Sequence, residues 1–355
     1  MITAIAAPAT DNGGSPANRD RAFTQQEPGS ATTLAVFDGH GPYGGEAATW
    51  ASAIAAASTD EPFPSLFQRM DTEIRTRLLS RLSEQSIPHN PHEEGIYTAA
   101  GHPIRGGTTA TILRIATNGS LECAHVGDSD VVYWDAPTDG GTVLMADHTP
   151  TSAAEHTRIR EICAQTEFSF AEPQKGPGTR PVWVGAPLGV APAGAPAPPA
   201  WQLNPRGGFL YSDARSNWGA YVVAGDASEC LAMTRSLGDF NLKRFGITAT
   251  PSVLKAPPPA PGNTRAIVIG SDGFWDSAAY AEVRDIVYRP DLVGNAAAAT
   301  AALLEWGRNR ARSIFGDRAD NLTVAVAYCS RPLPQPHQHQ QEISDPLPLG
   351  PSPCE

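Results

Sequence analysis

The stretch Leu34-Ala-Val-Phe-Asp-Gly-His-Gly41 joins an apolar run to an acidic, glycine-rich turn. Three other runs also adjoin an acid: Cys123–Gly127 before Asp128, Ile267–Gly270 before Asp272, and Leu322–Tyr328 after Asp320. Short apolar runs bounded by Gly, Asn or Asp are typical of buried strands. The pattern therefore predicts several carboxylates at the ends of core strands, where a rigid sheet can bring them together.

The rest of the chain alternates between strand and helix patterns. Strands are predicted over Thr32–Phe37, Thr108–Ile115, Leu121–Val126, Val131–Trp134, Thr142–Ala146, Tyr221–Ala224, Ala266–Ile269 and Leu322–Tyr328. Helices are predicted over Gly44–Ser58, around Leu66–Leu82 with its apolar residue at every fourth position, and over Asn295–Arg312. Ser152-Ala-Ala-Glu155 has the spacing of a capping box that opens a helix to about Cys163. Strands interleaved with helix pairs predict an α+β sandwich.

Composition limits the classes of function. The chain has 26 Lys and Arg against 37 Asp and Glu, a net charge of −11, which argues against binding to nucleic acid or an anionic membrane surface. Five widely spaced cysteines form neither a disulfide framework nor a zinc motif. We find neither a signal peptide nor an apolar window long enough to span a bilayer, so we expect a soluble intracellular protein, cytoplasmic or nuclear.

The 33 glycines and 33 prolines among 355 residues concentrate partly in two regions. Residues 165–219 contain Pro/Ala/Gly-rich segments typical of an irregular insertion, and residues 331–355 form a Pro/His/Gln-rich tail that we expect to be disordered. At about 150 residues per domain, the length allows two domains or one large one.

Each acid at a strand end, taken alone, is an ordinary turn residue. Together, carboxylates with a backbone carbonyl are the ligands that Mg²⁺ or Mn²⁺ prefer, and two such ions can activate a water and clamp a phosphoryl oxygen. Gly39 has no side chain, which would let its backbone carbonyl face an ion. The sequence contains no Gly-x-Ser-x-Gly nucleophile motif, so attack by water is favoured over covalent catalysis.

Eight motifs in order carry a family resemblance: Asp38–Gly41, Gly106–Ala110, Val126–Ser129, Asp147–Pro150 with Glu155–Ile159, Thr234–Asp239, Thr248–Pro251, Ser271–Asp276 and Asp320–Val324. The chain resembles the PP2C (PPM) metal-dependent Ser/Thr phosphatases from about Asn12 to Ser330. The resemblance implies a four-layer α-β-β-α sandwich of two antiparallel sheets flanked by helices. It also favours one catalytic domain over residues 1–330, with residues 165–219 in the family's flap region.

The resemblance further implies roles for individual residues. Asp38 resembles the ligand that bridges two ions, the Gly39 carbonyl a ligand of one ion, and Asp272 and Asp320 ligands of the other. Asp20 resembles an acid that acts through water, and Asp128 one that, with Asp272, holds a weaker third ion in some members. His40 resembles the proposed general acid, a role that suits an imidazole because the Ser or Thr alkoxide is a poor leaving group.

The sequence departs from the family pattern at two positions near these motifs. Ser15 stands where the family usually has an Arg that binds substrate phosphate, so we expect weaker phosphate binding. Strand alternation would point the nearby Arg19 elsewhere. Asp130 replaces a usual Arg, and we expect it to face solvent.

The function predicted is Mg²⁺- or Mn²⁺-dependent hydrolysis of phosphoserine and phosphothreonine in proteins by a monomeric enzyme, through a water or hydroxide bridging two ions. One alternative is a catalytically weak or inactive pseudophosphatase that acts as a binding module, which Ser15 and Asp130 motivate. Another is an unrelated metal-dependent hydrolase.

Overall fold

A computed structural model describes most of the chain. The described residues are 3–26, 30–58, 60–92, 95–162, 168–171, 183–184, 202–203, 209–212, 217–219, 221–224 and 229–333. Most of the predicted insertion at 165–219, and residues 334–355 of the predicted tail, lie outside these ranges.

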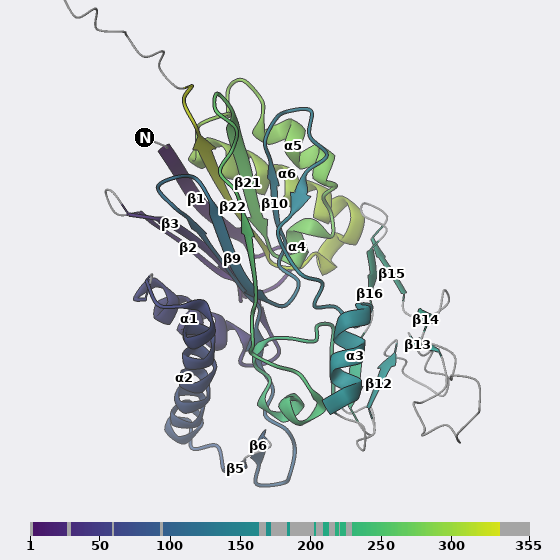
Figure 1. Cartoon of the computed structure of the whole chain (residues 1–355). Coiled ribbons are helices and arrows are strands. Elements are labelled where there is room, and N and C mark those ends of the chain that lie inside the picture. The colour runs from purple at the N-terminus through teal and green to yellow at the C-terminus, as the bar shows by residue number, and fades with distance from the viewer. Residues whose placement is uncertain are drawn as a thin grey trace, which may run out of the picture.

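Two five-stranded antiparallel sheets form the centre of the molecule (Figure 1). The first has the order β1 (Thr3–Asp11), β22 (Leu322–Ser330), β21 (Thr264–Gly270), β10 (Val131–Trp134) and β11 (Thr142–Val143). The second has the order β2 (Arg21–Gln26), β3 (Thr32–Phe37), β8 (Ala110–Ile115), β9 (Leu121–Val126) and β20 (Ser252–Ala256). In the first sheet β1 pairs with β22 from Thr3↔Ser330 to Asp11↔Leu322, so strands from opposite ends of the chain lie side by side.

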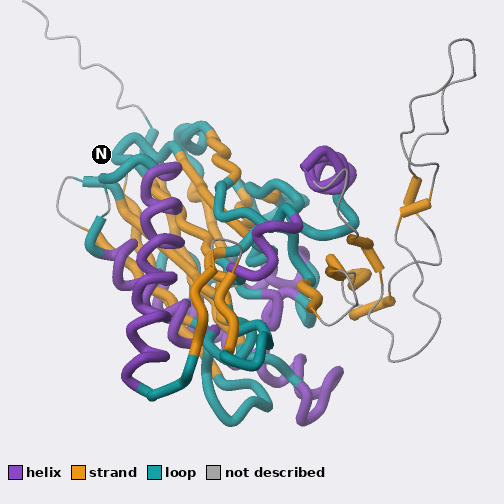
Figure 2. The backbone as a smooth tube through the Cα atoms, turned by 90° about the horizontal axis from the view of Figure 1, so that it is seen from below, coloured by secondary structure: helices purple, strands orange, loops and turns teal. Residues whose placement is uncertain are grey.

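Helices cover the outer faces of both sheets, as Figures 1 and 2 show. One face carries α1 (Gly44–Ala56) and α2 (Phe63–Glu84), and the other carries α4 (Asp272–Trp275), α5 (Tyr280–Val287) and α6 (Ala296–Phe315). The predicted α+β fold, an α-β-β-α sandwich of antiparallel sheets, is therefore confirmed. No helix among the described residues is long and apolar enough to cross a bilayer.

Smaller elements surround this sandwich. Near the acidic turns lie β4 (Gly39–His40), β7 (Gly107–Thr108), β19 (Leu237–Gly238), and the 3₁₀ helices η1 (Phe240–Phe245) and η2 (Gly316–Arg318). Farther out lie β5 (His89–His92), β6 (Gly95–Thr98) and α3 (Ala153–Ile162). Short strands within and just after the insertion region are β12 (Phe168–Ala171), β13 (Trp183–Val184), β14 (Gln202–Leu203), β15 (Phe209–Ser212), β16 (Asn217–Gly219), β17 (Tyr221–Ala224) and β18 (Glu229–Leu231).

The central strands are apolar on both faces because each face meets another layer. In β3, Leu34 and Val36 face the opposite sheet, while Ala35 and Phe37 pack under α1 and α2. Successive side chains of a strand point to opposite faces, so one continuous apolar run serves two cores. The stripe predicted at Leu66–Leu82 is likewise the buried face of α2.

Two local predictions were wrong. The strand expected over Thr142–Ala146 covers only Thr142–Val143, at the edge of its sheet. The capping box at Ser152 does not form, because the Ser152 N–H donates to the Thr149 carbonyl at 3.1 Å, while Glu155 binds arginines instead. The helix itself is present as α3.

Candidate active site

Asp38 lies where β3 gives way to the short strand β4. Two hydrogen bonds to Thr109 fix its backbone. The Asp38 N–H donates to the Thr109 hydroxyl at 3.0 Å, and the Thr109 N–H donates to the Asp38 carbonyl at 2.8 Å. At Gly39 a Cβ atom would lie 2.4 Å from the Gly44 carbonyl oxygen, so a side chain has no room there. The glycine thus lets the start of α1 approach the acidic turn, a packing reason that adds to the one expected from the sequence.

A second glycine brings two acids from distant parts of the chain together. Asp272 opens α4 directly after β21, and Asp320 precedes β22. A Cβ atom on Gly273 would lie 2.0 Å from the Asn321 carbonyl oxygen and 3.3 Å from the Asp320 Cβ. Only glycine permits this approach, which sets Asp272 beside Asp320.

We call Asp20, Asp38, Asp128, Asp272 and Asp320 the acidic group. Asp20 is its least exposed member, with only 1% of its surface accessible. One carboxylate oxygen, Oδ2, accepts from the Thr323 hydroxyl at 2.7 Å, which ties the residue to β22. Burial raises its pKa to about 7 despite that hydrogen bond, and the charges of Asp272 and Asp320 add to the increase.

The pKa of Asp38 is likewise raised well above its usual range, first by burial and then by the charges of Asp20 and Asp272. A hydrogen bond shared with Asp272 adds to the shift. Burial also raises the pKa of Asp128 to about 7, with contributions from Asp272 and Asp130. The structure thus brings Asp20, Asp38, Asp272 and Asp320 into mutual repulsion and places Asp128 next to Asp272.

These acids have the chemistry that a hard divalent cation needs, although no three acidic, histidine or cysteine side chains among the described residues already form a cage for an ion. Buried Oδ1 atoms of Asp20, Asp128 and Asp272 have no hydrogen-bond partner. A buried carboxylate oxygen without a partner is costly unless a cation or proton compensates it. Oxygen donors of this kind fit Mg²⁺ or Mn²⁺.

His40 follows the acidic turn and is paired with an acid that the sequence analysis gave no role. Its Nε2 lies 2.7 Å from Oδ2 of Asp239. Burial alone would lower the pKa of His40, but the charge and hydrogen bond of Asp239 more than offset this, and the net pKa is raised. The other ring nitrogen, Nδ1, is buried without a partner.

Asp239 is held in an unusual backbone conformation, with φ +47° at the residue that precedes η1. Its Oδ2 also accepts from the Ser236 hydroxyl at 2.6 Å, and it lies so close to Gly107 that a Cβ there would be 2.2 Å away. The quoted motif Thr234–Asp239 was the only sequence signal for this residue. Its pairing with a histidine 199 positions away could not be read from spacing.

Arg19 lies beside the acidic group, contrary to the expectation that strand alternation would turn it away. Residues 12–20 form a loop rather than a strand, so alternation does not apply. One guanidinium nitrogen, Nη1, donates to the Gly41 carbonyl at 3.5 Å. Burial and the charge of Asp272 raise the pKa of Asp320, and the positive charge of Arg19 offsets only part of this increase. Ser15 lies in the same loop, bonded through its N–H to the Asn12 carbonyl at 3.0 Å.

Asp130 does not simply face solvent, so that expectation was wrong. Its side chain is half-buried and its Oδ2 accepts from the Tyr280 hydroxyl at 2.7 Å. Its carbonyl accepts from the Trp275 indole N–H at 3.1 Å. Asp130 therefore connects the turn that carries Asp128 to helices α4 and α5.

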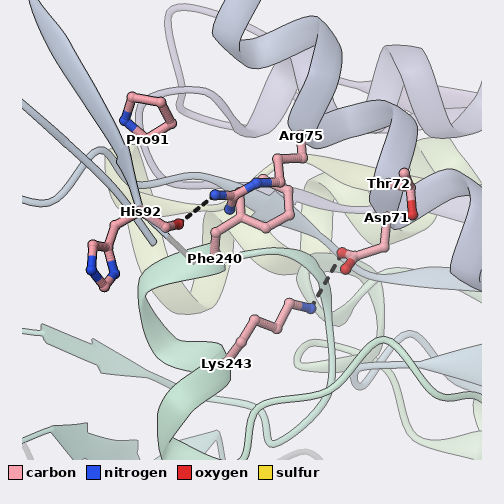
Figure 3. Close-up of a pocket in the computed structure, with 7 residues that line it drawn as sticks. All are labelled: Asp71, Thr72, Arg75, Pro91, His92, Phe240 and Lys243. Atoms are coloured by element: carbon pink, nitrogen blue, oxygen red, sulfur yellow. Dashed lines mark hydrogen bonds and ion pairs between the residues drawn. The ribbon is translucent and has the colours of Figure 1, made fainter. Parts of the chain in front are cut away.

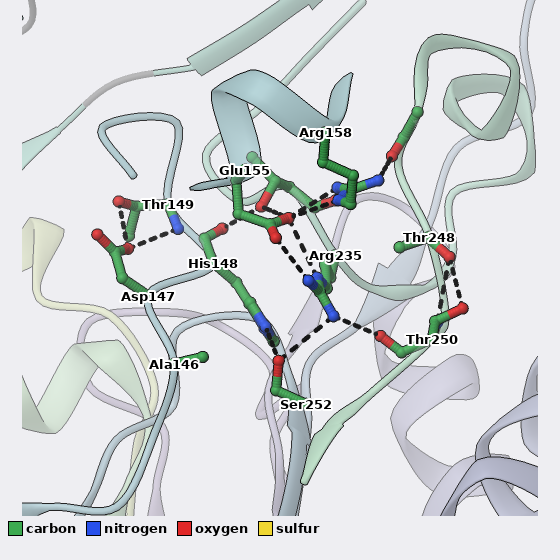
Figure 4. A network of polar contacts seen from close by, with 12 residues as sticks. Ala146, Asp147, His148, Thr149, Glu155, Arg158, Arg235, Thr248, Thr250 and Ser252 are labelled. Carbon is green, nitrogen blue, oxygen red and sulfur yellow. Dashed lines mark hydrogen bonds and ion pairs between the residues drawn. The ribbon is translucent and has the colours of Figure 1, made fainter. Parts of the chain in front are cut away.

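A separate cluster surrounds Glu155 of α3 (Figure 4). The carboxylate binds Arg235 at 2.6 Å through Oε1 and Arg158 at 2.7 Å through Oε2, and also accepts from the Thr234 hydroxyl. Although burial opposes ionisation, these bonds lower the pKa of Glu155 to about 2. Nearby, the rings of His125 and His148 stack with their centroids 4.3 Å apart.

Comparison with known proteins agrees with this architecture. The Protein phosphatase 2C family matches residues 16–169 and 206–312. A probable protein phosphatase 2C 61 of Arabidopsis thaliana is 25% identical over 302 residues, which cover 83% of this chain and 76% of the relative. A probable protein phosphatase 2C 52 of the same plant is 24% identical over 284 residues, covering 72% of this chain and 51% of the relative. The crystal structure of serine-threonine phosphatase 2C from Toxoplasma gondii has the same fold, with a TM-score of 0.56 and 17% identity, covering 93% of this chain and 99% of that one.

The fold and the matched residues define a protein serine/threonine phosphatase. The chain belongs to the Protein phosphatase 2C family, as its motifs indicated. Membership implies phosphorylated proteins as substrates and supports dependence on a divalent metal.

Proposed function

We propose that this chain hydrolyses phosphoserine and phosphothreonine in proteins with two divalent ions held by the acidic group. Asp38, Asp272 and Asp320, with the Gly39 carbonyl, would hold these ions, assisted by Asp20, while Asp128 with Asp272 would take a weaker third. The observation that carries the proposal is the set of buried carboxylate oxygens without partners on Asp20, Asp128 and Asp272. Bound Mg²⁺ or Mn²⁺ would activate water and polarise a phosphoryl oxygen.

Within this site His40 acts as the general acid. Asp239 holds Nε2 and raises the imidazole pKa, which favours the protonated ring. Nδ1, the ring atom without a partner, then carries the proton that is transferred to the departing Ser or Thr oxygen. Arg19 is the guanidinium available to the substrate phosphate, since its position beside Gly41 offers the charge that Ser15 lacks.

The test is hydrolysis of p-nitrophenyl phosphate with Mn²⁺ or Mg²⁺. Activity should disappear with EDTA and in Asp38→Ala and Asp272→Ala, while Asp291→Ala, at an exposed acid paired with Arg289, should behave as wild type. Hydrolysis that survives chelation would refute the metal-dependent mechanism. Tight metal binding without turnover of any phosphopeptide would favour a pseudophosphatase.

A further inference from the structure

A cavity of about 560 Å³ lies between α2 and η1, outside the acidic group. Asp71, Thr72 and Arg75 of α2 line one side, and Phe240 and Lys243 of η1 line the other (Figure 3). Pro91 and His92 of β5 complete the wall. The volume is within the range of pockets that bind small ligands or single side chains.

The charge of this cavity is opposite to that of the chain as a whole. Two cations, Arg75 and Lys243, face one carboxylate, Asp71, on a chain whose net charge is −11. The Arg75 guanidinium lies over the Phe240 ring, 5.2 Å from its centre, and donates to the His92 carbonyl. Stacking on an aromatic face holds the planar guanidinium in place.

Lys243 retains capacity for a further anion. Its ammonium donates to the Ser236 carbonyl at 2.9 Å and contacts Asp71 at 3.3 Å, a longer separation than the roughly 2.7–2.9 Å of a close charged hydrogen bond. An ammonium has three donors, so these two contacts leave one for a ligand. Lys243 and Asp71 are each partly exposed.

The cavity is connected to the active site by direct contacts. Asp71 accepts from the Gly238 N–H at 2.8 Å, Lys243 donates to Ser236, and Ser236 in turn binds Asp239, the partner of His40. Lys243 follows Asp239 by four residues along 3₁₀ helix, a rise of about 8 Å, which corresponds to between about two and three residues of extended peptide.

We propose that this pocket binds an acidic side chain of the phosphoprotein substrate, a few positions from the phosphorylated residue. The proposal rests on the phosphatase function above, because it assigns a specificity pocket to that same active site. A substrate carboxylate in this pocket would accept hydrogen bonds from Lys243 and Arg75. The pocket would therefore select substrates with an acidic residue near the phosphorylated Ser or Thr.

The test compares phosphothreonine peptides that carry a single Glu at each of the four positions on either side with their Gln counterparts. In the wild type, kcat/KM should be about fivefold higher for Glu at one or two positions, the size expected of a partly exposed charge pair. The preference should disappear at high salt. Arg75→Leu and Lys243→Met should each reduce the Glu/Gln ratio toward one.

Arg77→Leu is the matched control, because Arg77 lies on the same helix, does not line the cavity and pairs with Glu73. It should keep the wild-type ratio. A ratio of one at every position in the wild type would overturn the proposal, as would an unchanged ratio in both pocket variants. Hydrolysis of p-nitrophenyl phosphate, measured alongside, separates this failure from loss of the phosphatase function itself.

Discussion

Asp20 and Glu155 are both buried acids, 1% and 2% exposed, yet their surroundings differ in kind. Glu155 is enclosed by Arg158, Arg235 and Thr234, and its pKa is lowered to about 2. Asp20 lies among other acids with one oxygen unpartnered, and its pKa is raised to about 7. A buried carboxylate whose charge is balanced by arginines of the protein belongs to the fold, whereas one that faces other carboxylates is a candidate for binding a cation.

The largest effect expected from this comparison is at Asp38. Asp38→Asn should lower kcat for phosphopeptide on the order of 10³-fold, because several kcal/mol of metal-assisted stabilisation would be lost. In EDTA the same variant should be at least as stable as wild type, since it removes a repelling charge. Thermal unfolding with and without Mn²⁺ measures this. Marked destabilisation in EDTA would place Asp38 with Glu155 as a structural acid.

Glu155→Gln, unlike Asp38→Asn, should reduce the stability of the fold. Leaving two arginines without their buried partner should reduce the free energy of unfolding by about 3 kcal/mol. Glu73→Gln is the control, because the exposed Glu73–Arg77 pair should be worth only about 0.3–0.5 kcal/mol. Urea unfolding compares the variants, and equal small losses would mean that the cluster contributes no more than a surface pair.

The stability difference between wild type and Glu155→Gln should depend on pH. The folded-state pKa lies below the usual value of 4.5, so the unfolded chain takes up the proton first. The contribution of Glu155 is therefore complete above about pH 4.5 and should be lost as pH falls toward 2. Urea unfolding at several pH values tests this, and a difference that stays constant down to pH 3 would contradict it.

Asp239 extends the comparison of Asp20 with Glu155. It lies in the candidate active site, yet His40 and Ser236 bind its carboxylate and its pKa is lowered despite burial. Asp239→Asn, which tolerates the positive φ, should reduce kcat for a phosphothreonine peptide about 30-fold. For p-nitrophenyl phosphate, whose leaving group needs no proton, the loss should be small. Equal losses for both substrates would mean that Asp239 only maintains the local structure.

The smallest effect is expected from adding a cation at Ser15, in the loop that also carries Arg19 and Asp20. Ser15→Arg should lower KM for phosphopeptide by about threefold, the size of a partly exposed charge contact. Ser313→Arg, at an exposed position of α6, is the control. An unchanged KM in Ser15→Arg would show that an arginine at this position adds nothing to the phosphate contact proposed for Arg19.

The sequence predicted the central strands well and the sheet edges poorly. β3, β9 and β10 have the predicted bounds, because both of their faces are largely buried and their sequences are rich in apolar and β-branched residues. Within the two five-stranded sheets, the strands that were missed, β1, β2 and β20, all lie at edges. An edge strand is partly exposed and lacks that run, and β1 even contains Pro8, which edges tolerate.

Asp38, Asp128, Asp272 and Asp320 were identified in advance because each lies within two residues of an apolar run, whereas Asp20 was assigned only from the family resemblance. The contacts of Asp239 and Glu155 could not be identified in this way. Their long-range contacts, such as Glu155 with Arg235 at a separation of 80 residues and Asp239 with His40 at 199, depend on how whole elements pack. Asp130 was misjudged for the same reason, since Tyr280 reaches it from α5.

The bond between Glu155 and Arg235 also has a consequence for how the chain can be varied. It fixes the two ends of the stretch that includes the Pro/Ala/Gly-rich insertion, whatever its length. Closing a flexible loop costs only about 0.6 kcal/mol more each time its length doubles. We therefore expect that a segment grafted between α3 and Thr234, which keeps Arg158 and Thr234 in contact with Glu155, would leave the acids of the candidate site in position.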